Sequence, residues 1–406
     1  MKVLVVGSGG REHALCWKLS QSPLLTELHA APGSPGIGRL GTCHPVRVQD
    51  VAGLVDLCED LRIDLAVIGP EAPLVAGLAD ELRRAGIAVF GPSAAAAQIE
   101  GSKSFAKDVM TAAGVPTARA LDEAIAPCVV KADGLAAGKG VFVCTTQAEA
   151  EDALFRARAL GGETVIEELL QGEEVSLFAL CDGVRAIPLP AAQDYKRIRD
   201  GDRGPNTGGM GSFSPAPIMP PDLAAELVRQ VHEPVLAELA ERDAPFVGLL
   251  YAGLMLTPDG VRVLEFNCRF GDPETQSILP LIEGDLLEAL RAAANGDLSG
   301  VELASTPEWS VTVVLASRGY PDSSESGIPI RGLDRAEATG ALVFHAGTAL
   351  REGEVISAGG RVLNVTATGA TAAEARDRAY AAVAEIDFPG SQHRTDIALK
   401  AVRADG

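Results

Sequence analysis

The first hundred residues alternate short apolar runs with amphipathic stretches, and this alternation restricts the fold more than any other feature of the sequence. Apolar runs at Lys2–Val6, Leu65–Ile68 and Ile87–Phe90 have the length of buried strands. Helical patterns at Arg11–Leu19 and Leu74–Ala85 lie between them. Strands that alternate with helices form a parallel sheet with helices on both faces. The sequence therefore predicts an N-terminal doubly wound α/β domain.

A different pattern follows this domain. Ala94–Gly114 predicts one long helix, because a glycine ends it and Pro116 stands just beyond. Short strands then surround a glycine-rich turn and a helix at Ala148–Leu160. Two longer apolar strands are joined by the Asp259-Gly260 turn, which predicts a hairpin. These segments indicate α+β structure in the middle of the chain.

The last ninety residues or so predict a compact α+β closing module. SVTVVLAS and ALVFHAG have strand patterns, and VISAGGRVLNVTA predicts a hairpin that turns at Gly359-Gly360. The spacing of Thr371 and Glu374 is that of a capping box, which predicts a helix over Ala372–Glu385. Because 406 residues are too many for one core, we expect several domains. The expected parts are residues 1–101, 102–117, 118–179, 180–311 and 312–406.

Composition excludes several classes of protein. The net charge of −20 opposes non-specific nucleic-acid binding, which needs a basic surface. The sequence has no run of 18 apolar residues, and its N-terminus lacks the longer apolar region of a signal peptide. Seven cysteines without a CxxC pair indicate neither a disulfide framework nor a zinc site. We therefore expect a cytoplasmic protein without nucleic-acid or membrane partners, and we expect it to be a monomer.

The segment GSGGRE at residues 7–12 lies where the first strand ends and the first helix begins. Glycines there let the backbone approach a ligand, and the free N–H groups of a helix start attract an anion. A dinucleotide site would need a small residue where Glu12 stands. The turn therefore favours a phosphorylated sugar over NAD, although a tight turn without a ligand fits this segment equally well.

The segment VVKADGLAAGKGV at residues 129–141 carries a stronger signal. Lys131 ends an apolar strand, a loop of small residues follows, and Lys139 starts the return strand. Backbone N–H groups and two ammonium groups of such a loop can face polyphosphate oxygens. It is not a Walker A loop, because GxxxxGK[ST] is absent. The alternative is a glycine-rich hairpin with solvated lysines.

The segment LEFNCRFGDPE at residues 264–274 predicts a metal site beside an anion site. Glu265 and Asn267 lie two apart in a strand and so share a face, whereas Leu264 and Phe266 should enter the core. Their hard oxygen atoms suit Mg²⁺. Arg269 offers a fork for a carboxylate, and Asp272-Pro273-Glu274 has the pattern of a helix N-cap and first turn. The alternative is an exposed polar strand face.

Two weaker signals complete the candidate site. Acidic pairs in VIEELL and GEEVS, at residues 165–176, could offer backbone groups to adenine and a carboxylate to ribose. The charged QDYKRIR and the glycine-rich GPNTGGMG, at residues 193–211, are typical of an active-site wall. A solvated strand edge and a surface loop are the respective alternatives.

Taken together, these motifs resemble the phosphoribosylamine–glycine ligase family of ATP-grasp enzymes. The matching stretches are GSGGREHAL, VIGPEAPL, FGPS, EGSKSFAK, VVKADGLAAGKGV, QDYKR, GPNTGGMG, LEFNCRFGDPETQ and FHAGT. They extend over nearly the whole chain. The resemblance implies that ATP drives the joining of glycine to 5-phosphoribosylamine through glycyl phosphate, giving glycinamide ribonucleotide, ADP and phosphate. This is the second step of de novo purine (IMP) synthesis, and the resemblance implies Mg²⁺ or Mn²⁺ as the metal.

The resemblance also implies a role for each matching residue. It makes 118–179 the ATP-grasp lid, 180–311 the central part with the metal site, and 1–101 the side that binds the sugar phosphate. The implied catalytic residues are Lys131, Lys139 and Arg269, and the implied metal ligands are Glu265 and Asn267. ATP would contact Lys103, Lys131, Gly134, Gly138, Lys139, Gly140, Glu167, Glu168, Leu170 and Glu174. The other substrates would contact Gly9, Gly10, Arg11, Glu12, Asp194, Lys196, Asn206, Arg269, Gly271, Asp272, Pro273 and Glu274.

The sequence departs from the family pattern in two places. Residues 120–127 and 160–164 are shorter than expected, which predicts a trimmed lid. The strand GLLYAGLML has no acidic residue that could serve a second Mg²⁺. The alternatives are another ATP-grasp carboxylate–amine ligase, a non-catalytic nucleotide-binding regulator, and a nicotinamide-dependent dehydrogenase. The first would keep the lysine loop and change the turns around Arg269; the second could lose Glu265 or Lys131 without cost.

Overall fold

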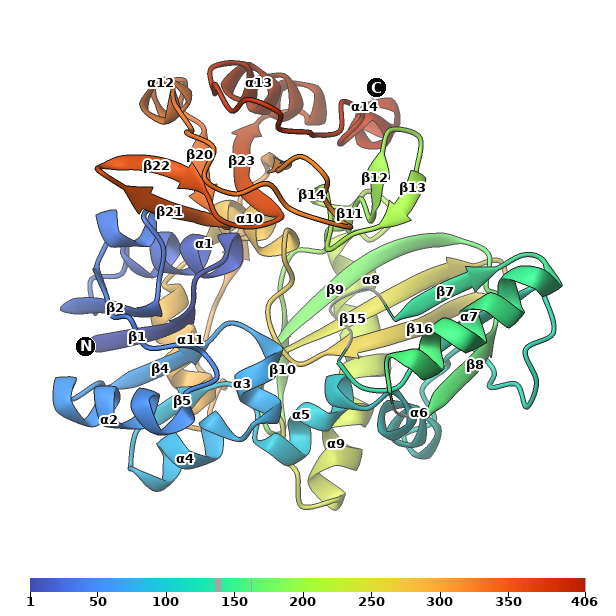
Figure 1. The fold of residues 1–406 in the computed structure, drawn as a ribbon. Helices are drawn as coiled ribbons and strands as arrows, with labels where there is room; N and C mark the ends of the chain where they lie inside the picture. Colours follow the sequence, from blue (N-terminus) through green and yellow to red (C-terminus); the bar gives the residue numbers. More distant parts are fainter. Residues whose placement is uncertain (136–139, 162, 406) are drawn as a thin grey trace.

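A computed structural model describes residues 1–135, 140–161 and 163–405, and it confirms the predicted fold class (Figure 1). The N-terminal domain is a parallel sheet in the order β3-β2-β1-β4-β5. Alternate residues of β1 pack into two different cores, because Leu4 and Val6 belong to one apolar cluster and Val3 and Val5 to the other. Both faces of the sheet are therefore buried, as a doubly wound sheet requires.

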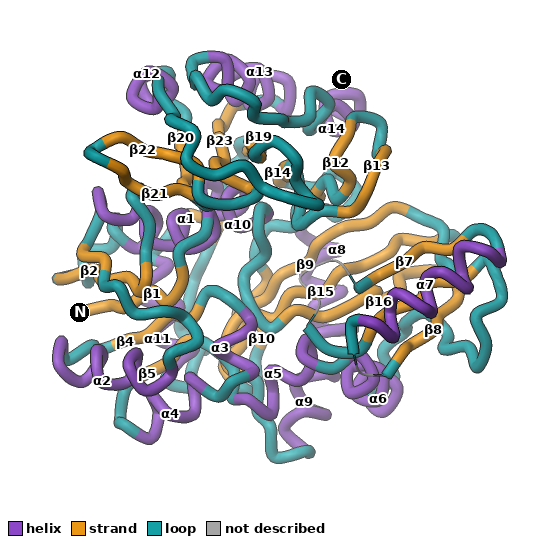
Figure 2. The backbone as a smooth tube through the Cα atoms, viewed as in Figure 1, coloured by secondary structure: helices purple, strands orange, loops and turns teal. Residues whose placement is uncertain are grey.

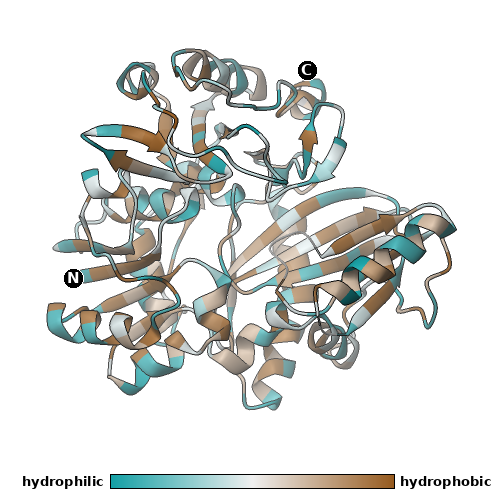
Figure 3. Ribbon diagram, viewed as in Figure 1, coloured by the Kyte–Doolittle hydropathy of each residue, from teal (hydrophilic) through white to brown (hydrophobic). Residues whose placement is uncertain are grey.

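Three strands of this sheet follow the predicted positions closely, whereas β2 and β3 were not predicted. They are β1 (Lys2–Gly7), β2 (Glu27–Pro32), β3 (Thr42–Cys43), β4 (Leu65–Ile68) and β5 (Ala88–Phe90). The helices around them are α1 (Gly10–Leu19), η1 (Ile37–Arg39), α2 (Val51–Leu61), α3 (Glu71–Val75) and α4 (Leu78–Arg84). Figure 3 shows that β1 and β4 are coloured mostly toward the hydrophobic end of the scale, whereas the surrounding helices are mixed.

Two predicted helices are each divided in two, and the prediction of continuous helices was wrong. Gly77, with φ of +88°, separates α3 from α4. Ser102 is extended and separates α5 (Ala94–Gly101) from α6 (Lys103–Ala112), and its hydroxyl accepts a hydrogen bond from Phe105 N–H. A serine that caps a new helix in this way offers the backbone an alternative to continued helix. The break places Lys103 at the first residue of α6.

The middle of the chain forms two separate antiparallel sheets. A three-stranded sheet in the order β7-β6-β8, covered by α7, projects from the body of the molecule (Figure 1). A four-stranded sheet in the order β10-β9-β15-β16 lies behind it, and the hairpin of β15 and β16 confirms the predicted turn at Asp259-Gly260. The strand β9 runs through residue 180, where a boundary was expected, and belongs wholly to the second sheet.

The elements of these two sheets have the following bounds. The first sheet and its helix are β6 (Cys128–Ala132), β7 (Val141–Cys144), α7 (Gln147–Ala159) and β8 (Thr164–Glu168). The second consists of β9 (Glu173–Asp182), β10 (Ala186–Pro188), β15 (Val247–Thr257) and β16 (Gly260–Asn267). Around them lie β12 (Arg197–Arg199), β13 (Arg203–Asn206), α8 (Pro221–Leu227), η2 (Val228–His232), α9 (Glu233–Glu241), α10 (Glu274–Ile278), η3 (Leu279–Leu281), β17 (Ile282–Glu283), α11 (Leu286–Ala294) and β18 (Ala304–Ser305).

The closing module is built on a five-stranded sheet in the order β11-β14-β19-β23-β20. Two of its strands, β11 (Gln193–Asp194) and β14 (Gly211–Ser214), come from before residue 312. The other strands are β19 (Trp309–Ala316), β20 (Leu342–His345) and β23 (Arg361–Gly369). The remaining elements are α12 (Leu333–Ala338), β21 (Thr348–Arg351), β22 (Glu354–Ser357), α13 (Ala372–Ala384) and α14 (Leu399–Asp405). Figure 2 shows this module above the other two parts, with α10 between them.

The predicted hairpin at Gly359-Gly360 was wrong. The strand β22 pairs with β21, whereas β23 pairs with β19 and β20. The apolar residues of β23 bury themselves in the core of the closing module, so this strand takes a central place in the larger sheet. Gly359 instead allows a close crossing, because a Cβ on Gly347 would lie 2.7 Å from its Cα. Within the described part of the chain, no helix is long and apolar enough to cross a membrane.

Candidate active site

Four cations from distant segments converge on Glu265. They are Lys103 at the start of α6, Lys131 on β6, Lys196 after β11 and Arg269 after β16. Burial opposes the ionisation of this carboxyl, but the four positive charges outweigh it and lower the pKa of Glu265 below its usual value. The sheet β7-β6-β8 (called the lid sheet below), the sheet β10-β9-β15-β16 (called the central sheet below) and the closing module therefore meet at one ionised carboxylate.

Lys131 is fixed by two acceptors. Its Nζ donates to Leu264 O at 2.9 Å and lies 2.7 Å from Glu167 Oε2. The pairing of β15 with β16 shifts at this point, since Gly253 faces Glu265 and Leu254 faces Val263. Leu264 is thus the bulged residue, and it is half-buried rather than in the core as predicted.

Glu167 binds a second lysine that was absent from the predicted site. Lys107 Nζ lies 2.8 Å from Glu167 Oε1, and Glu167 is only 3% exposed. Lys107 also donates to Thr117 Oγ1 at 2.8 Å. The signal for Lys107 was present in EGSKSFAK, because it follows Lys103 by four residues and so shares its helix face.

Asp133 ties the start of the glycine-rich segment to α6. It accepts hydrogen bonds from Lys103 N–H at 2.5 Å, Gly134 N–H at 2.9 Å and Ser104 Oγ at 2.6 Å. Burial opposes ionisation of Asp133, but these hydrogen bonds lower its pKa. Lys103 Nζ in turn donates to Gly134 O at 3.0 Å. The predicted ATP-binding residues Gly138 and Lys139 lie outside the described residues, and the carbonyl of Gly140 accepts from Ala132 N–H at 2.8 Å.

The predicted nucleotide residues on the other side of the lid lie on or near the strands β8 and β9. The backbone and the side chain of Glu168 both contact Arg119. Glu168 N–H donates to Arg119 O at 3.0 Å, and Glu168 Oε1 accepts from the backbone N–H of Arg119 at 2.8 Å. Leu170 follows β8 and is half-buried. Glu174 Oε2 on β9 lies 2.7 Å from Lys196 Nζ.

Arg269 is already held by acidic side chains. Its guanidinium lies 3.1 Å from Glu100 Oε1 and 3.4 Å from Glu71 Oε2. Burial lowers the pKa of Arg269, but Glu100 and then Glu71 outweigh it and raise the pKa well above the usual value. Neither acid was predicted, although both occur in the matching motifs EGSKSFAK and VIGPEAPL, because nothing local in sequence connects them with Arg269.

Asn267 offers an amide oxygen beside Glu265. Its Oδ1 accepts from Arg269 Nη2 at 3.2 Å, and a carbonyl oxygen has a second lone pair for another partner. The described segments contain no cluster of three or more His, Cys, Asp or Glu that could hold a metal ion. An ionised carboxylate and an amide oxygen fit Mg²⁺ or Mn²⁺ only if phosphate oxygens and water supply the remaining ligands.

The GSGGRE turn is filled by its own glutamate. Glu12 is 2% exposed, accepts from Gly9 N–H at 2.6 Å and lies 2.5 Å from Arg11 Nε. A Cβ on Gly7 would lie 2.5 Å from Glu12 Cγ, and one on Gly69 would lie 2.1 Å from Glu12 Oε1. These glycines therefore make room for Glu12, so this residue shapes the turn in addition to excluding NAD. Gly10 is packed against Asn364 and Gln276 in the same way.

The GDPE turn lies on the other side of the Arg11 side chain, which donates to Phe270 O at 3.1 Å. The predicted cap was wrong by one residue: α10 begins at Glu274, its N-cap is Pro273, and Asp272 instead pairs with Arg361 at 3.3 Å. Burial raises the pKa of Asp272, but Arg361 and other donors outweigh it.

Glu274 belongs to a buried hydrogen-bonded group. Tyr251 Oη donates to Glu274 Oε1 at 2.9 Å, and Ser176 Oγ lies 2.8 Å from Tyr251 Oη. Gly271 has no room for a side chain, because a Cβ there would lie 2.6 Å from Glu274 Oε2. Glu274 and Asp194 also lie close enough to interact: burial, and then the charges of Glu274 and Glu174, raise the pKa of Asp194 to about 7 despite Lys196.

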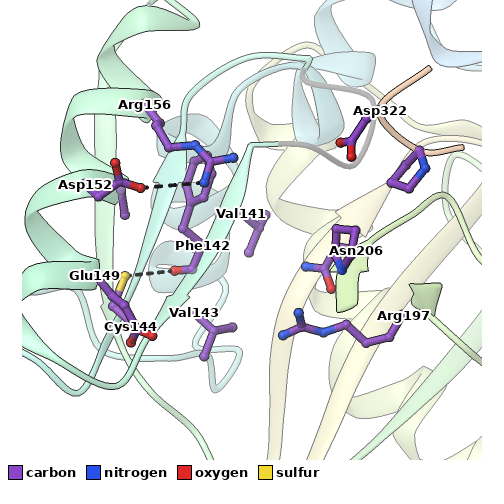
Figure 4. A pocket seen from close by; sticks show the side chains of 13 residues that line it. Val141, Phe142, Val143, Cys144, Glu149, Asp152, Arg156, Arg197, Asn206 and Asp322 are labelled. Atoms are coloured by element: carbon purple, nitrogen blue, oxygen red, sulfur yellow. Dashed lines mark hydrogen bonds and ion pairs between the residues drawn. The ribbon is translucent and has the colours of Figure 1, made fainter. Parts of the chain in front are cut away.

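Asn206 lies apart from this group, on the wall of a cavity of about 320 Å³. Figure 4 shows Asn206 and Arg197 on one side of this cavity and Phe142, Asp152 and Arg156 of the lid on the other. The cavity therefore separates the lid from the β12–β13 hairpin, and Asn206 faces the lid across it.

The lid sheet carries Lys131, and the antiparallel central sheet opposite it carries the ionised carboxylate of Glu265. This arrangement defines an ATP-grasp enzyme. The chain belongs to the phosphoribosylglycinamide synthetase family, whose N domain matches residues 1–100, whose ATP-grasp (A) domain matches 101–275 and whose C domain matches 310–400.

Individual relatives agree with this assignment over the whole chain. The phosphoribosylamine–glycine ligase of Streptomyces coelicolor is 55% identical, and that of Brucella melitensis is 51% identical; the alignments cover 100% of this chain and 100% and 99% of the relatives. The crystal structure of the phosphoribosylamine–glycine ligase of Thermotoga maritima has a TM-score of 0.84 and 34% identity, covering 98% of this chain and 100% of that chain. A biotin carboxylase of Campylobacter jejuni, 14% identical with a TM-score of 0.71, covers 99% of this chain and 95% of its own and shares the fold alone.

Proposed function

We propose that this chain joins glycine to 5-phosphoribosylamine while ATP is converted to ADP and phosphate, giving glycinamide ribonucleotide in the second step of de novo purine synthesis. The match to all three domains of one family and the names of its relatives support this activity. The observation that carries it in the structure is the convergence of four cations on Glu265.

The reaction needs an activated carboxylate, because a carboxylate oxygen is a poor leaving group when an amine attacks. Transfer of the γ-phosphoryl group of ATP to a glycine carboxylate oxygen gives glycyl phosphate. The amine of phosphoribosylamine then attacks the acyl carbon and phosphate departs. The protein must supply position and charge compensation rather than a nucleophile, so we propose no covalent protein intermediate.

Charge compensation falls to the lysines around the nucleotide. We propose that Lys103, Lys131 and Lys139 contact the phosphates, with Gly134, Gly138 and Gly140 supplying backbone groups. Glu167 orients Lys131 through the 2.7 Å ion pair. We propose that the backbone at Glu168 and Leu170 contacts adenine, and that Glu174 contacts the ribose.

We propose that Glu265 and Asn267 hold Mg²⁺ or Mn²⁺. The cations around Glu265 keep it ionised, and Asn267 Oδ1 has a free lone pair, so both atoms can act as ligands. A bound divalent cation offsets the negative charge of phosphate oxygens. The residues themselves contribute a fixed pair of oxygen atoms on one face of β16.

The remaining predicted residues form the substrate side. We propose that Arg269, fixed by Glu71 and Glu100, orients the glycine carboxylate next to the GDPE turn. The residues proposed for the glycine and sugar-phosphate sites are Gly9, Gly10, Arg11, Glu12, Asp194, Lys196, Gly271, Asp272, Pro273 and Glu274. Asn206 is left out, because it lies apart from this group and faces the lid. We propose that the part of 118–179 that precedes β9 acts as the lid, and that the protein is a cytoplasmic monomer; residues 173–179 belong to the central sheet.

One assay tests the proposed activity. ADP release is measured with glycine alone and then with phosphoribosylamine generated in place, and alanine and serine serve as control amino acids. The proposal predicts sustained ADP release only with both substrates and only with glycine. Equal release with alanine, or no release with glycine and phosphoribosylamine together, would contradict it. A radiolabelled acyl group that stays on the denatured protein would contradict the absence of a covalent intermediate.

A further inference from the structure

Arg361, at the start of β23, connects the closing module with two parts of the predicted active site. The Arg361 guanidinium donates from Nη1 to Gly208 O, to Gly209 O at 3.4 Å and to Asp272 O at 2.7 Å. Its Nη2 lies 3.3 Å from Asp272 Oδ2, and the side chain is 20% exposed. One planar group therefore binds the GPNTGGMG loop and the GDPE turn at the same time, and the fork of arginine suits such multiple acceptors.

A second residue of the closing module holds the same loop from its other side. Gly208 N–H donates to Tyr320 Oη at 3.0 Å, so both backbone groups of Gly208 are bound by this module. Tyr320 lies against Gly360, where a Cβ would come within 2.4 Å of the ring. A Cβ on Gly208 would likewise lie 3.0 Å from Arg361 Cζ. The glycines at both positions allow this close packing.

The bound loop positions the lysine beside Glu265. Thr207 N–H and Thr207 Oγ1 donate to Lys196 O at 2.7 Å and 2.9 Å. Lys196 Nζ lies 2.7 Å from Glu174 Oε2, and its charge is one of those that lower the pKa of Glu265. A displacement of Gly208 would therefore move Lys196 through Thr207.

The GDPE turn, which Arg361 also binds, positions the opposite side of the site, which carries Glu274. Asp272 Oδ1 accepts from Gln276 Nε2 at 2.8 Å, and Glu274, two residues further on, accepts from Tyr251. The two sides touch each other through Gly209 and Pro273 as well, since a Cβ on Gly209 would lie 2.4 Å from Pro273 Cδ. Arg361 therefore connects the Lys196 side of the site with the Glu274 side.

We propose that Arg361 is a positioning residue for the amino-acid and sugar-amine sites. Through Arg361 the closing module sets the distance between the side of the site that carries Lys196 and the side that carries Glu274. This inference rests on the proposed function, because it concerns the substrates of that same site. Arg361 contacts neither Lys103 nor Lys131 among its described hydrogen bonds and ion pairs, and it reaches Glu174 only through Lys196, so its loss should affect the nucleotide side less than the amino-acid and sugar-amine sites.

The test is a kinetic comparison of Arg361→Ala with the unaltered protein. We expect kcat/KM for glycine and for phosphoribosylamine to fall by about 100-fold, as for a misplacement on the order of 1 Å, while KM for ATP changes less than about twofold. Added guanidinium ion should raise the activity of this variant about tenfold and should not raise that of the unaltered protein. Arg361→Lys keeps the charge without the fork and should be intermediate. Arg378→Ala, which removes an exposed ion pair with Glu374, should leave the kinetics unchanged.

Two results would overturn the proposal: an equal rise in KM for all three substrates, or full activity in Arg361→Ala. If that variant does not fold, Tyr320→Phe decides, because it removes only the hydroxyl bound to Gly208 N–H. It should raise KM for glycine about threefold and leave KM for ATP unchanged, and an unchanged KM for glycine would overturn the proposal. Glycine-dependent ADP release by the unaltered protein is measured first, so its absence counts against the proposed function and not against Arg361.

Discussion

Lowering the pH from 7 to 5 should weaken the contact between the N-terminal domain and the closing module, because two buried histidines meet there. The rings of His13 on α1 and His345 on β20 lie 5.6 Å apart, and His13 Nδ1 accepts from His345 N–H at 2.8 Å. Burial, followed by the charges of His345 and Arg39, lowers the pKa of His13 to about 3. Burial, followed by the charge of Arg39, lowers the pKa of His345 to about 4.

The sign and size of the effect follow from these pKa values. In the unfolded chain both rings titrate near pH 6.5, so below that pH the unfolded chain binds more protons than the folded chain. Stability is therefore complete above pH 6.5 and is lost as the pH falls toward the folded pKa values. At pH 5 the loss is about 2 kcal/mol for each ring, or about 4 kcal/mol for the pair, since one pH unit corresponds to about 1.4 kcal/mol.

Urea unfolding at pH 5, 6 and 7 measures this loss. Between pH 7 and pH 5 the unaltered protein should lose about 4 kcal/mol more of its free energy of unfolding than the variant with both His13→Gln and His345→Gln. His393→Gln is the control, because His393 lies outside this contact; burial also lowers the pKa of His393, so this variant should lose a small part of the pH dependence and retain most of it. Histidine Cε1–H resonances of His13 and His345 that titrate near pH 6.5 in the folded protein would refute the reasoning.

Three further substitutions test other parts of the site. Glu265→Gln should remove most of kcat while the circular dichroism spectrum is unchanged; a fully active, magnesium-dependent variant would contradict the metal assignment. Lys107→Met removes one of the two lysines on Glu167 and should destabilise the protein by about 1–3 kcal/mol and raise KM for ATP, since Lys131 still compensates the carboxylate. An unchanged melting temperature would show that the pair contributes nothing. Gly69→Ala places a Cβ 2.1 Å from Glu12 Oε1 and should lower the free energy of unfolding by about 1–3 kcal/mol. Gly300→Ala is the control and should be neutral, because no atom lies within 4 Å of its Cβ. Equal melting temperatures of the two variants would refute the packing argument.

Local patterns in the sequence were sufficient for much of the fold. The apolar run of β4 and the hairpin at Asp259-Gly260 were predicted correctly, because each depends on residues that are neighbours in sequence. Propensity was misleading where a cap intervened, as at Ser102, whose hydroxyl begins a new helix inside an otherwise helical pattern. The pairing of β23 with β19 could not be inferred from the Gly359-Gly360 turn, because it depends on which distant strand offers the larger apolar surface.

In the site, too, residues in distinctive local motifs could be predicted, whereas their distant partners could not. Lys131 and Glu265 stood out because each ends or follows an apolar strand next to a distinctive motif. The partners of Arg269, namely Glu71 and Glu100, could not be connected with it, since they lie 198 and 169 residues earlier and meet it only through the packing of the N-terminal domain on β16. Arg361 was missed for a similar reason, because three of its acceptors are backbone carbonyls, which any residue carries, and its ion-pair partner Asp272 lies 89 residues earlier.

The claim on which the account depends is that one triphosphate and one metal ion share the site of Glu265. Anomalous diffraction from crystals grown with Mn²⁺ and a non-hydrolysable ATP analogue locates both directly. The account predicts a manganese peak about 2.0–2.3 Å from oxygen atoms of Glu265 and Asn267 and of the terminal phosphates, with Lys131 in contact with the phosphates. A manganese peak elsewhere, or a triphosphate that does not reach Lys131, would contradict it.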